Sequence, residues 1–375
     1  MGGHSWNPFK RKSNKGEAST ASENIASSTA INAVYYPNWR VYRSQPPSSL
    51  NLRFITHIFY AFARVETDGA IVSTDEWADS GIDINGIKGC INDLKAVKER
   101  YPHVKTVLSF GGGGKGSEGF PAVAGNANSR LKFAHDARRM IDSQAFDGID
   151  IDWEHPSNST QGAHYIQLLS ALRQLLPTPQ YLLTSALPAG QWALRNINIG
   201  RAANYLDLIN LMTYDFSGPW TDVCGHQSQL YSPTNPPNDA ASTSCDSAVK
   251  YVLSHGVKSQ KILMGIPAYG RSFLEGTGVG TPYNGSGGEM GSFEYKDLPR
   301  PRASVHIDNK VVAVYCVGRD GGFVTYDDTR TVRVKAEYAK KQGLGGLFYW
   351  TGTGDRNDYL SLVEAGYRCL YPHQP

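Results

Sequence analysis

The sequence has few cysteines and almost no net charge. Its five cysteines among 375 residues form no C-x-x-C pair and are scattered along the chain: Cys90, Cys224, Cys245, Cys316 and Cys369. An odd, scattered set fits neither a zinc site nor a dense disulfide framework. Only Cys224 and Cys245, which flank one loop, suggest a bridge, and free thiols are favoured. Basic residues exceed acidic ones by three, which gives no argument for a nucleic-acid partner.

Long hydrophobic runs are also absent. No run approaches 18 apolar residues, so the sequence predicts no transmembrane helix and no membrane partner. Residues 1–30 are rich in Ser, Asn and Lys without apolar periodicity, which is typical of a flexible polar tail. They lack the apolar stretch of a secretory signal peptide. We therefore expect an intracellular protein that meets its substrate inside the cell or after lysis, with secretion as the alternative.

From Ile31 onward, short apolar runs alternate with longer amphipathic stretches. Eight runs are candidate strands: 31–36, 54–62, 106–110, 148–151, 181–186, 206–212, 261–267 and 345–349. Five stretches between them have the periodicity of helices: 87–100, 130–143, 164–176, 246–254 and 330–341. Eight strands alternating with helices predict an α/β fold, a (β/α)8 TIM barrel rather than a doubly wound sheet.

One interval breaks this rhythm. More than seventy residues separate the seventh and eighth candidate strands, whereas a β-α-β unit needs about thirty. Residues 272–322 are rich in Gly and contain short alternating segments such as 311–317. The sequence therefore predicts a catalytic barrel from 31–271 and 323–375, with a small α+β domain inserted at 272–322 between strands seven and eight.

The fourth candidate strand ends in a row of acids, in the sequence FDGIDIDWE at 146–154. Side chains alternate along a strand, so Asp150, Asp152 and Glu154 share one face and the apolar residues between them share the other. In a barrel the acids then climb the interior toward the C-terminal rim, where active sites of this fold lie. Three acids about 7 Å apart cannot all ionise easily, so at least one pKa should rise, as a general acid requires. A divalent-metal site and a solvated acidic edge are the alternatives.

Four motifs lie on or at the ends of the third, fourth, sixth and eighth candidate strands. They are Ser109-Phe110-Gly111-Gly112, Asp147-x-x-Asp150-x-Asp152-x-Glu154, Met212-Thr213-Tyr214-Asp215 and Gly346-Leu347-Phe348-Tyr349-Trp350. Together they resemble the S-x-G-G, D-x-x-D-x-D-x-E, M-x-Y-D and strand-eight patterns of family-18 glycoside hydrolases, the chitinases. The likeness runs from about Ile31 to Tyr367, and the insertion is similar to that of the bacterial-type branch.

The resemblance implies a retaining mechanism in which the acetamide of the substrate is the nucleophile. Glu154 would protonate the glycosidic oxygen and later activate water. Asp152 would orient the acetamide and stabilise the oxazolinium cation, while Asp150 shares a proton with Asp152. Tyr214 would hydrogen-bond the acetamide carbonyl. We expect a structural role for Asp147.

The resemblance also implies substrate contacts near the strand ends: Asp215, Trp350, Met212, Tyr269, Arg271, Tyr36, Phe62 and Trp220. Trp350 would form the floor beneath the cleaved sugar, because pyranose C–H faces stack on indole. Core packing is the alternative for Met212, Tyr36 and Phe62, and Trp220 is assigned to the leaving-group side. We expect Ser109, Gly111 and Gly112 to set backbone shape rather than to perform chemistry. Many chitinases carry Trp after S-x-G-G, whereas Gly113-Gly114 follow here, which argues against a stacking platform at that point.

These observations predict a chitinase that cleaves β-1,4 linkages in chitin and N-acetylglucosamine oligosaccharides. No protein partner is implied. No metal or organic cofactor is expected, because no His/Cys ligand set accompanies the acids. One alternative is an endo-β-N-acetylglucosaminidase acting on N-glycans. The other is a non-hydrolytic chitin-binding lectin on the same fold, against which the intact acids Asp150, Asp152 and Glu154 argue.

Overall fold

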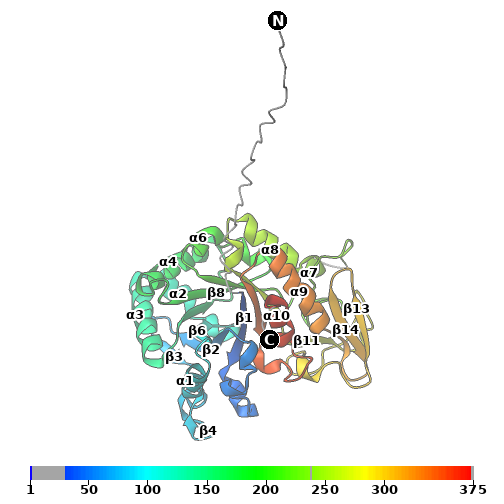
Figure 1. Ribbon diagram of the computed structural model, residues 1–375, viewed down its shortest axis with the longest axis horizontal. Coiled ribbons are helices and arrows are strands. Elements are labelled where there is room, and N and C mark those ends of the chain that lie inside the picture. The colour runs from blue at the N-terminus through cyan, green and yellow to red at the C-terminus, as the bar shows by residue number, and fades with distance from the viewer. Residues whose placement is uncertain (2–29, 237–238, 373–375) are drawn as a thin grey trace.

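The computed structural model describes Met1 and residues 30–236 and 239–372, so the predicted tail lies almost entirely outside the described residues. Eight parallel strands form the centre of the molecule (Figure 1): β1 (Ile31–Pro37), β2 (His57–Val65), β6 (Lys105–Gly111), β7 (Gly148–Asp152), β8 (Leu182–Pro188), β9 (Leu208–Met212), β10 (Ile262–Pro267) and β16 (Gly346–Trp350). Each strand pairs with the next, and β1 pairs with both β2 and β16. The sheet is therefore closed, which confirms the predicted barrel.

Helices surround the barrel on its outside (Figure 1). They are α1 (Cys90–Arg100), α2 (Phe120–Gly125), α3 (Ala127–Gln144), α4 (Ser159–Leu175), α5 (Gln191–Leu194), α6 (Ile199–Ala203), α7 (Asp239–Ser242), α8 (Cys245–Ser254), α9 (Thr329–Lys341) and α10 (Leu362–Leu370). Side chains at the N-caps satisfy backbone N–H groups that lack a partner within the helix, such as Asn126 before α3 and Asp328 before α9. These caps begin the helices close to where amphipathic periodicity predicts them.

Short helical turns and small strands occupy the loops. The turns are η1 (Asn38–Arg43), η2 (Pro47–Ser49), η3 (Leu52–Phe54), η4 (Trp77–Gly81), η5 (Gly114–Ser117), η6 (Ser259–Lys261), η7 (Tyr295–Asp297) and η8 (Gly352–Gly354). All are 3₁₀ turns except η4, which is π-helical. Strand β3 (Ile71–Ser73) pairs antiparallel with β2, and β4 (Asp83–Ile84) with β5 (Ile87–Lys88). Several of these turns lie at the C-terminal ends of barrel strands and shape the rim.

Alternation along β7 separates two hydrophobic regions. Ile149 and Ile151 are fully buried in the large core between the strands and the surrounding helices. A smaller cluster, which includes Tyr35, Phe59 and Phe348, fills the inside of the barrel. The acids of β7 therefore point inward, as the strand period predicts.

An antiparallel sheet is inserted between β10 and β16, at the predicted place. Its strands are β11 (Tyr269–Phe273), β12 (Ser292–Glu294), β13 (Ser304–Asp308), β14 (Ala313–Gly318) and β15 (Gly322–Tyr326), in the order β12-β11-β15-β14-β13. It extends beyond the predicted limits 272–322 at both ends. Residues 272–322 are all described and contain no α-helix, so the helical part of the expected α+β insertion is limited to η7. Figure 1 shows this sheet beside α9 and α10.

The five cysteines are free thiols. Cys224, in the segment between β9 and α7, is buried against Phe273 and Phe323 of the inserted sheet, whereas the thiol of Cys245 lies against the backbone carbonyls of Thr213 and Ser228. The two thiols that sequence spacing suggests as a pair thus pack into different places. Within residues that the structure describes, no helix combines the length and apolarity needed to cross a membrane.

Candidate active site

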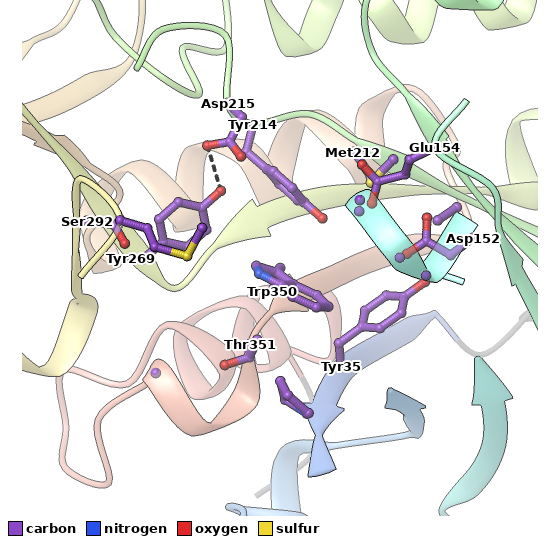
Figure 2. Close-up of a pocket in the computed structure, with 18 of the residues that line it drawn as sticks. Tyr35, Asp152, Glu154, Met212, Tyr214, Asp215, Tyr269, Ser292, Trp350 and Thr351 are labelled. Atoms are coloured by element: carbon purple, nitrogen blue, oxygen red, sulfur yellow. Dashed lines mark hydrogen bonds between the residues drawn. The ribbon is translucent and has the colours of Figure 1, made fainter. Parts of the chain in front are cut away.

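A cleft of about 1620 Å³ opens at the C-terminal ends of the barrel strands. Met212 at the end of β9 and Trp350 at the end of β16 both line it, and so does Glu154, two residues beyond β7. In a parallel barrel the loops that follow all eight strands lie at the same end and surround the barrel axis. Side chains far apart in the sequence therefore lie close together there. Figure 2 shows Trp350 near the centre, with Asp152 and Glu154 on one side and Tyr269 and Ser292 on the other.

Asp150 lies deepest and is fully buried. Its carboxylate accepts three hydrogen bonds: from the hydroxyls of Tyr35 at 2.8 Å, Ser109 at 2.7 Å and Thr184 at 2.7 Å. Burial raises the pKa of Asp150, and the three hydroxyl donors work in the opposite direction. The Ser109 side chain thus also helps to position Asp150, a contact that the sequence-based expectation did not include.

Asp152 is the next acid along the strand and is 3% exposed. Its Oδ1 atom is buried and has no hydrogen-bond partner among the described residues. Burial raises the pKa of Asp152 well above its usual value, and the charges of Glu154 and Asp150 raise it further. Burial and the two neighbouring acids therefore favour the protonated form of Asp152, and its unpartnered oxygen can receive a polar group.

Glu154 lies at the rim, with its side chain 29% exposed. Burial first and the charge of Asp215 second raise its pKa to about 7. Its backbone N–H donates to the hydroxyl of Ser117 in η5 at 2.8 Å, which fixes where the strand end turns outward. A carboxyl group with this pKa can both donate and accept a proton near neutrality. The expected rise of at least one pKa in this row of acids is present.

A second polar cluster lies at the β9 and β11 ends. The Asp215 carboxylate accepts the Tyr269 hydroxyl at 2.8 Å and a bidentate pair from Arg271, with Nε at 2.7 Å and Nη2 at 2.8 Å. The Tyr214 ring meets the Tyr269 ring edge-on at 6.3 Å. The Arg271 guanidinium also lies over the Trp220 ring, 4.9 Å from its centroid. The structure thus brings together these five residues, all of which the sequence singles out.

Aromatic rings form the floor of the cleft. Trp350 stacks against Phe62 at 5.8 Å, Phe62 lies 6.3 Å from Trp39, and Tyr35 lies 5.4 Å from Trp350. Met212 packs with the aromatic cluster inside the barrel and lines the cleft as well. Flat apolar faces of this kind suit the C–H faces of pyranose rings.

Tyr36 is the one predicted substrate contact that the structure places elsewhere. Its hydroxyl donates to the Gln45 carbonyl at 2.9 Å and lies 3.5 Å from the Cys90 sulfur, on the outer side of the barrel wall. Neighbouring residues on a strand point to opposite faces, so Tyr35 takes the inward position. The prediction for Tyr36 is wrong, and Tyr35 is the residue that lines the cleft.

Sequence reasoning also missed Trp39 and Trp192, which line the cleft and are 45% and 65% exposed. Trp39 lies two residues after β1, at the rim of the barrel. The predicted end of this strand could have indicated that position. Trp192 lies in α5 after β8, a loop without a recognised motif. Gly113 brings no ring beside Glu154, and the exposed indoles that line the cleft are those of Trp39, Trp192 and Trp220.

Asp147 lies outside this site. It pairs with Lys98 at 2.8 Å and Lys105 at 3.3 Å and accepts the Thr106 backbone N–H at 2.8 Å. Burial raises the pKa of Asp147, but the lysine and backbone donors lower it more, so that the pKa lies below its usual value. Its contacts are those of a structural residue. In the part of the chain covered by the structure, no group of three His, Cys, Asp or Glu side chains could hold a metal ion.

A closed (β/α)8 barrel with inward-facing acids beneath an aromatic cleft, and a rim carboxyl with a pKa of about 7, is an arrangement suited to a glycoside hydrolase. Residues 31–355 match the model of glycosyl hydrolases family 18. The chain therefore belongs to that family. This confirms the family, the enzyme class and the chitinase-type relationship that the four motifs predict.

Several known chitinases are similar to this protein along nearly the whole chain. Endochitinase 1 of Metarhizium robertsii is 36% identical over 89% of this chain and 83% of its own length. Chitinase 1 of Aphanocladium album is 35% identical over 90% and 85%. Among solved structures, the Group IV chitinase of Ostrinia furnacalis in complex with allosamidin has a TM-score of 0.83 at 26% identity, covering 92% of this chain and 100% of that one. The Cycas revoluta chitinase in complex with (GlcNAc)3 has a TM-score of 0.79 at 27% identity, covering 91% and 99%.

Proposed function

We propose that this family-18 hydrolase is a chitinase that cleaves β-1,4 linkages of N-acetylglucosamine polymers and oligomers by a retaining, substrate-assisted mechanism. The observation that carries the proposal is the pair formed by Asp152 and Glu154. One is a buried acid with an unpartnered oxygen, and the other is a rim acid with a pKa of about 7. The names of the relatives support it, since they are chitinases and one solved complex holds (GlcNAc)3.

In the first step, the sugar to be cleaved lies on Trp350, and protonated Glu154 donates its proton to the glycosidic oxygen. The C1–O bond breaks as the acetamide carbonyl oxygen of the same sugar attacks C1, which forms an oxazolinium ion. Because the nucleophile is already part of the substrate, little entropy is lost in bringing it to C1. Tyr214 binds the acetamide oxygen and holds it in line.

Asp152 accepts the acetamide N–H during this step. Asp152 must be deprotonated to accept this hydrogen bond as a carboxylate. Asp150 then shares the proton that Asp152 gives up. The hydroxyls of Tyr35, Ser109 and Thr184 compensate the charge that remains on Asp150. The negative charge on Asp152 then stabilises the oxazolinium cation.

In the second step, the Glu154 carboxylate accepts a proton from water, and the resulting oxygen nucleophile attacks C1 from the face that the leaving group left. The acetamide is released, Glu154 is protonated again, and the product has the β configuration. Asp215 with Arg271 and Tyr269 binds hydroxyl groups of the sugar. The non-hydrolytic lectin alternative is not favoured, because the proton donor is in place.

The test is to incubate the protein with N-acetylglucosamine oligomers and to record the anomers by NMR immediately after cleavage. We expect β products from acetylated oligomers and no cleavage of fully deacetylated ones. Release of α products would contradict participation of the acetamide, because a single displacement inverts C1. Cleavage confined to N-glycans, with chito-oligomers left intact, would favour the endo-β-N-acetylglucosaminidase alternative.

A further inference from the structure

The loop that carries Asp215 ends in a segment that is polar and yet buried. Residues 226–229, with the sequence His-Gln-Ser-Gln, lie between β9 and α7 and are each no more than 6% exposed. The mechanism uses none of them. Buried polar groups are costly unless they form hydrogen bonds, so the partners of this segment show what it holds in place.

Gln227 is bonded to both sides of the contact between Asp215 and Tyr269. The Tyr269 hydroxyl donates to the Asp215 carboxylate at 2.8 Å (Figure 2). The side-chain amide of the fully buried Gln227 donates to the Tyr269 carbonyl at 2.8 Å. The Gln227 carbonyl accepts the Phe216 backbone N–H at 3.0 Å. Because Phe216 directly follows Asp215, one residue connects the backbones of both partners.

Asp215 depends on its neighbours for its conformation. Its φ of 59° lies in the left-handed region, which residues other than glycine rarely adopt and which the surrounding structure must maintain. Burial first and the negative charge of Asp215 second raise the pKa of Glu154 to about 7. The position of Asp215 thus affects both the sugar site and the proton donor.

Ser228, the next residue along the chain, is held by a buried ion pair. Lys335 and Asp327 are 0% and 1% exposed, and the Lys335 Nζ atom lies 2.7 Å from Asp327 Oδ2. The Lys335 ammonium also donates to the Ser228 carbonyl at 2.5 Å, and the Ser228 hydroxyl donates to Asp327 Oδ2 at 2.7 Å. The Thr331 hydroxyl donates to the other carboxylate oxygen at 2.7 Å. Each charged group therefore has partners that offset the cost of its burial.

The ion pair joins this loop to the inserted sheet. Asp327 directly follows β15, and Lys335 lies on α9. Strand β15 pairs with β11, which carries Tyr269 and Arg271. Asp215 lies on a barrel loop, whereas the two residues that bind its carboxylate lie on the inserted sheet. The contacts of residues 227 and 228 therefore set how the Asp215 loop lies against that sheet.

We propose that Gln227 and the Lys335–Asp327 pair are positioning residues, which hold the Asp215 carboxylate at the sugar site against its partners on β11. The inference rests on the proposed function and adds residues that act through Asp215. None of the three is among the described residues that line the cleft. Without them, Asp215 and its partners move apart, so that sugar binding weakens and less negative charge acts on Glu154.

The first test replaces Gln227 by Met, which keeps the length of the side chain and removes the amide donor. No acceptor bond is lost, because Gln227 Oε1 has no partner among the described residues. On chito-oligomers at 25 °C we expect KM to rise roughly three- to tenfold, with a smaller fall in kcat. The alkaline limb of kcat/KM should move to lower pH, as in Asp215→Asn, because less negative charge acts on Glu154. The other ionisable groups that face Glu154 are unchanged in this variant: Asp152, Tyr214 and His155.

Gln229→Met is the matched control. Gln229 is 1% exposed, and its amide donates to the Thr243 carbonyl, which has no contact with the Asp215 carboxylate. Both substitutions remove a buried bond from a side chain to the backbone, so both should lower the melting temperature to a similar extent. Only Gln227→Met should shift the pH profile. A shift of equal size in Gln229→Met would assign the effect to general loosening of the segment and would overturn the role of Gln227.

The ion pair is tested with the double variant Lys335→Met/Asp327→Leu, which leaves no unpaired charge in the interior. We expect KM to rise roughly threefold and the alkaline limb to move in the same direction as in Gln227→Met. A folded double variant with unchanged KM and an unchanged pH profile would remove the ion pair from the proposal. If the double variant does not fold, the Gln227 variants decide.

A double-mutant cycle with Asp215→Asn measures whether Gln227 acts through Asp215. Once the carboxylate is gone, Gln227→Met should change KM and the pH profile little further. Losses that add in the combined variant, or an unaltered KM and pH profile in Gln227→Met alone, would overturn the positioning role and leave the proposed function intact. If the unmodified chain cleaves no N-acetylglucosamine oligomer, the proposed function fails and this inference fails with it.

Discussion

The Tyr35 hydroxyl donates a 2.8 Å hydrogen bond to Asp150 at the bottom of the barrel, and it receives one of the same length from the Asn210 amide. Strands β1, β7 and β9 are thereby joined through one phenol. Asp150 is a fully buried acid beneath the catalytic pair. In the proposed mechanism Asp150 shares a proton with Asp152, and the bond from Tyr35 would stabilise the charged form of Asp150 in that exchange.

Tyr35→Phe removes this donor, and we expect kcat on chito-oligomers to fall by about tenfold, since hydrogen bonds to charged groups contribute about 1.5–3 kcal/mol. KM should change little, because Tyr35 acts through Asp150. The neighbouring Tyr36→Phe is the matched control and should leave kcat unaltered, since the Tyr36 hydroxyl bonds to Gln45 outside the site. Equal effects of the two substitutions would refute the role assigned to Tyr35.

The rate should depend on the proton on Glu154. Because its pKa is about 7 and the protonated form donates, kcat/KM should fall about tenfold per pH unit above neutrality. Asp215→Asn removes a negative charge that raises this pKa, so the alkaline limb should move to lower pH. The control is Asp358→Asn, whose carboxylate lies with Arg356 at the surface. A limb that stays in place in Asp215→Asn would contradict this assignment of cause.

Glu154→Gln should abolish hydrolysis while stabilising the fold at alkaline pH. Loss of the proton donor costs about two to four orders of magnitude in kcat. The folded state raises the pKa of Glu154 from 4.5 to about 7, so between these values it binds more protons than the unfolded state. Stability therefore declines as pH rises through this range, by up to roughly 3 kcal/mol.

The amide does not titrate, so Glu154→Gln should have a higher melting temperature than the unmodified protein at pH 8 and a similar one at pH 4. Calorimetry at the two values measures the difference. A lower melting temperature for Glu154→Gln at pH 8 would show that the ionised Glu154 side chain does not destabilise the folded state.

Asp147 should matter for stability and not for the reaction. Asp147→Ala removes the carboxylate that pairs with Lys98 and accepts the Thr106 N–H, and we expect a loss of about 2–3 kcal/mol in the free energy of unfolding at pH 7. Because the folded pKa of Asp147 is lowered, its contribution is present above pH 3.8 and disappears as pH falls below it.

Activity of folded Asp147→Ala at 25 °C should equal that of the parent. Asp83→Ala is the comparison, because Asp83 and Lys88 are both more than half exposed, and such pairs contribute little. Denaturant titrations at pH 7 and pH 3 test both statements. A strong loss of kcat in Asp147→Ala with unchanged stability would reverse the assignment.

Much of the architecture follows from local pattern. The strand period places Asp150, Asp152 and Glu154 on one face, and burial of Ile149 and Ile151 on the other face against the helices turns the acids inward. Eight apolar runs alternating with amphipathic stretches predict the closed barrel, and the long interval before the last strand predicts the insertion. These features depend on residues close together in the chain, so the sequence alone determines them.

The remaining features depend on which strands become neighbours and how they are staggered. Tyr35 and Tyr36 are equally aromatic and adjacent, and only the facing of β1 in the closed sheet selects Tyr35. The register of β6 and β8 against β7 pairs Asp150 with both Ser109 and Thr184, and their hydroxyls bond to its carboxylate. The raised pKa values arise from burial that no single segment provides, and Trp192 reaches the cleft through a loop without a motif. The sequence determines which chemical groups are present. The distances between these groups and their exclusion from water depend on the assembled barrel.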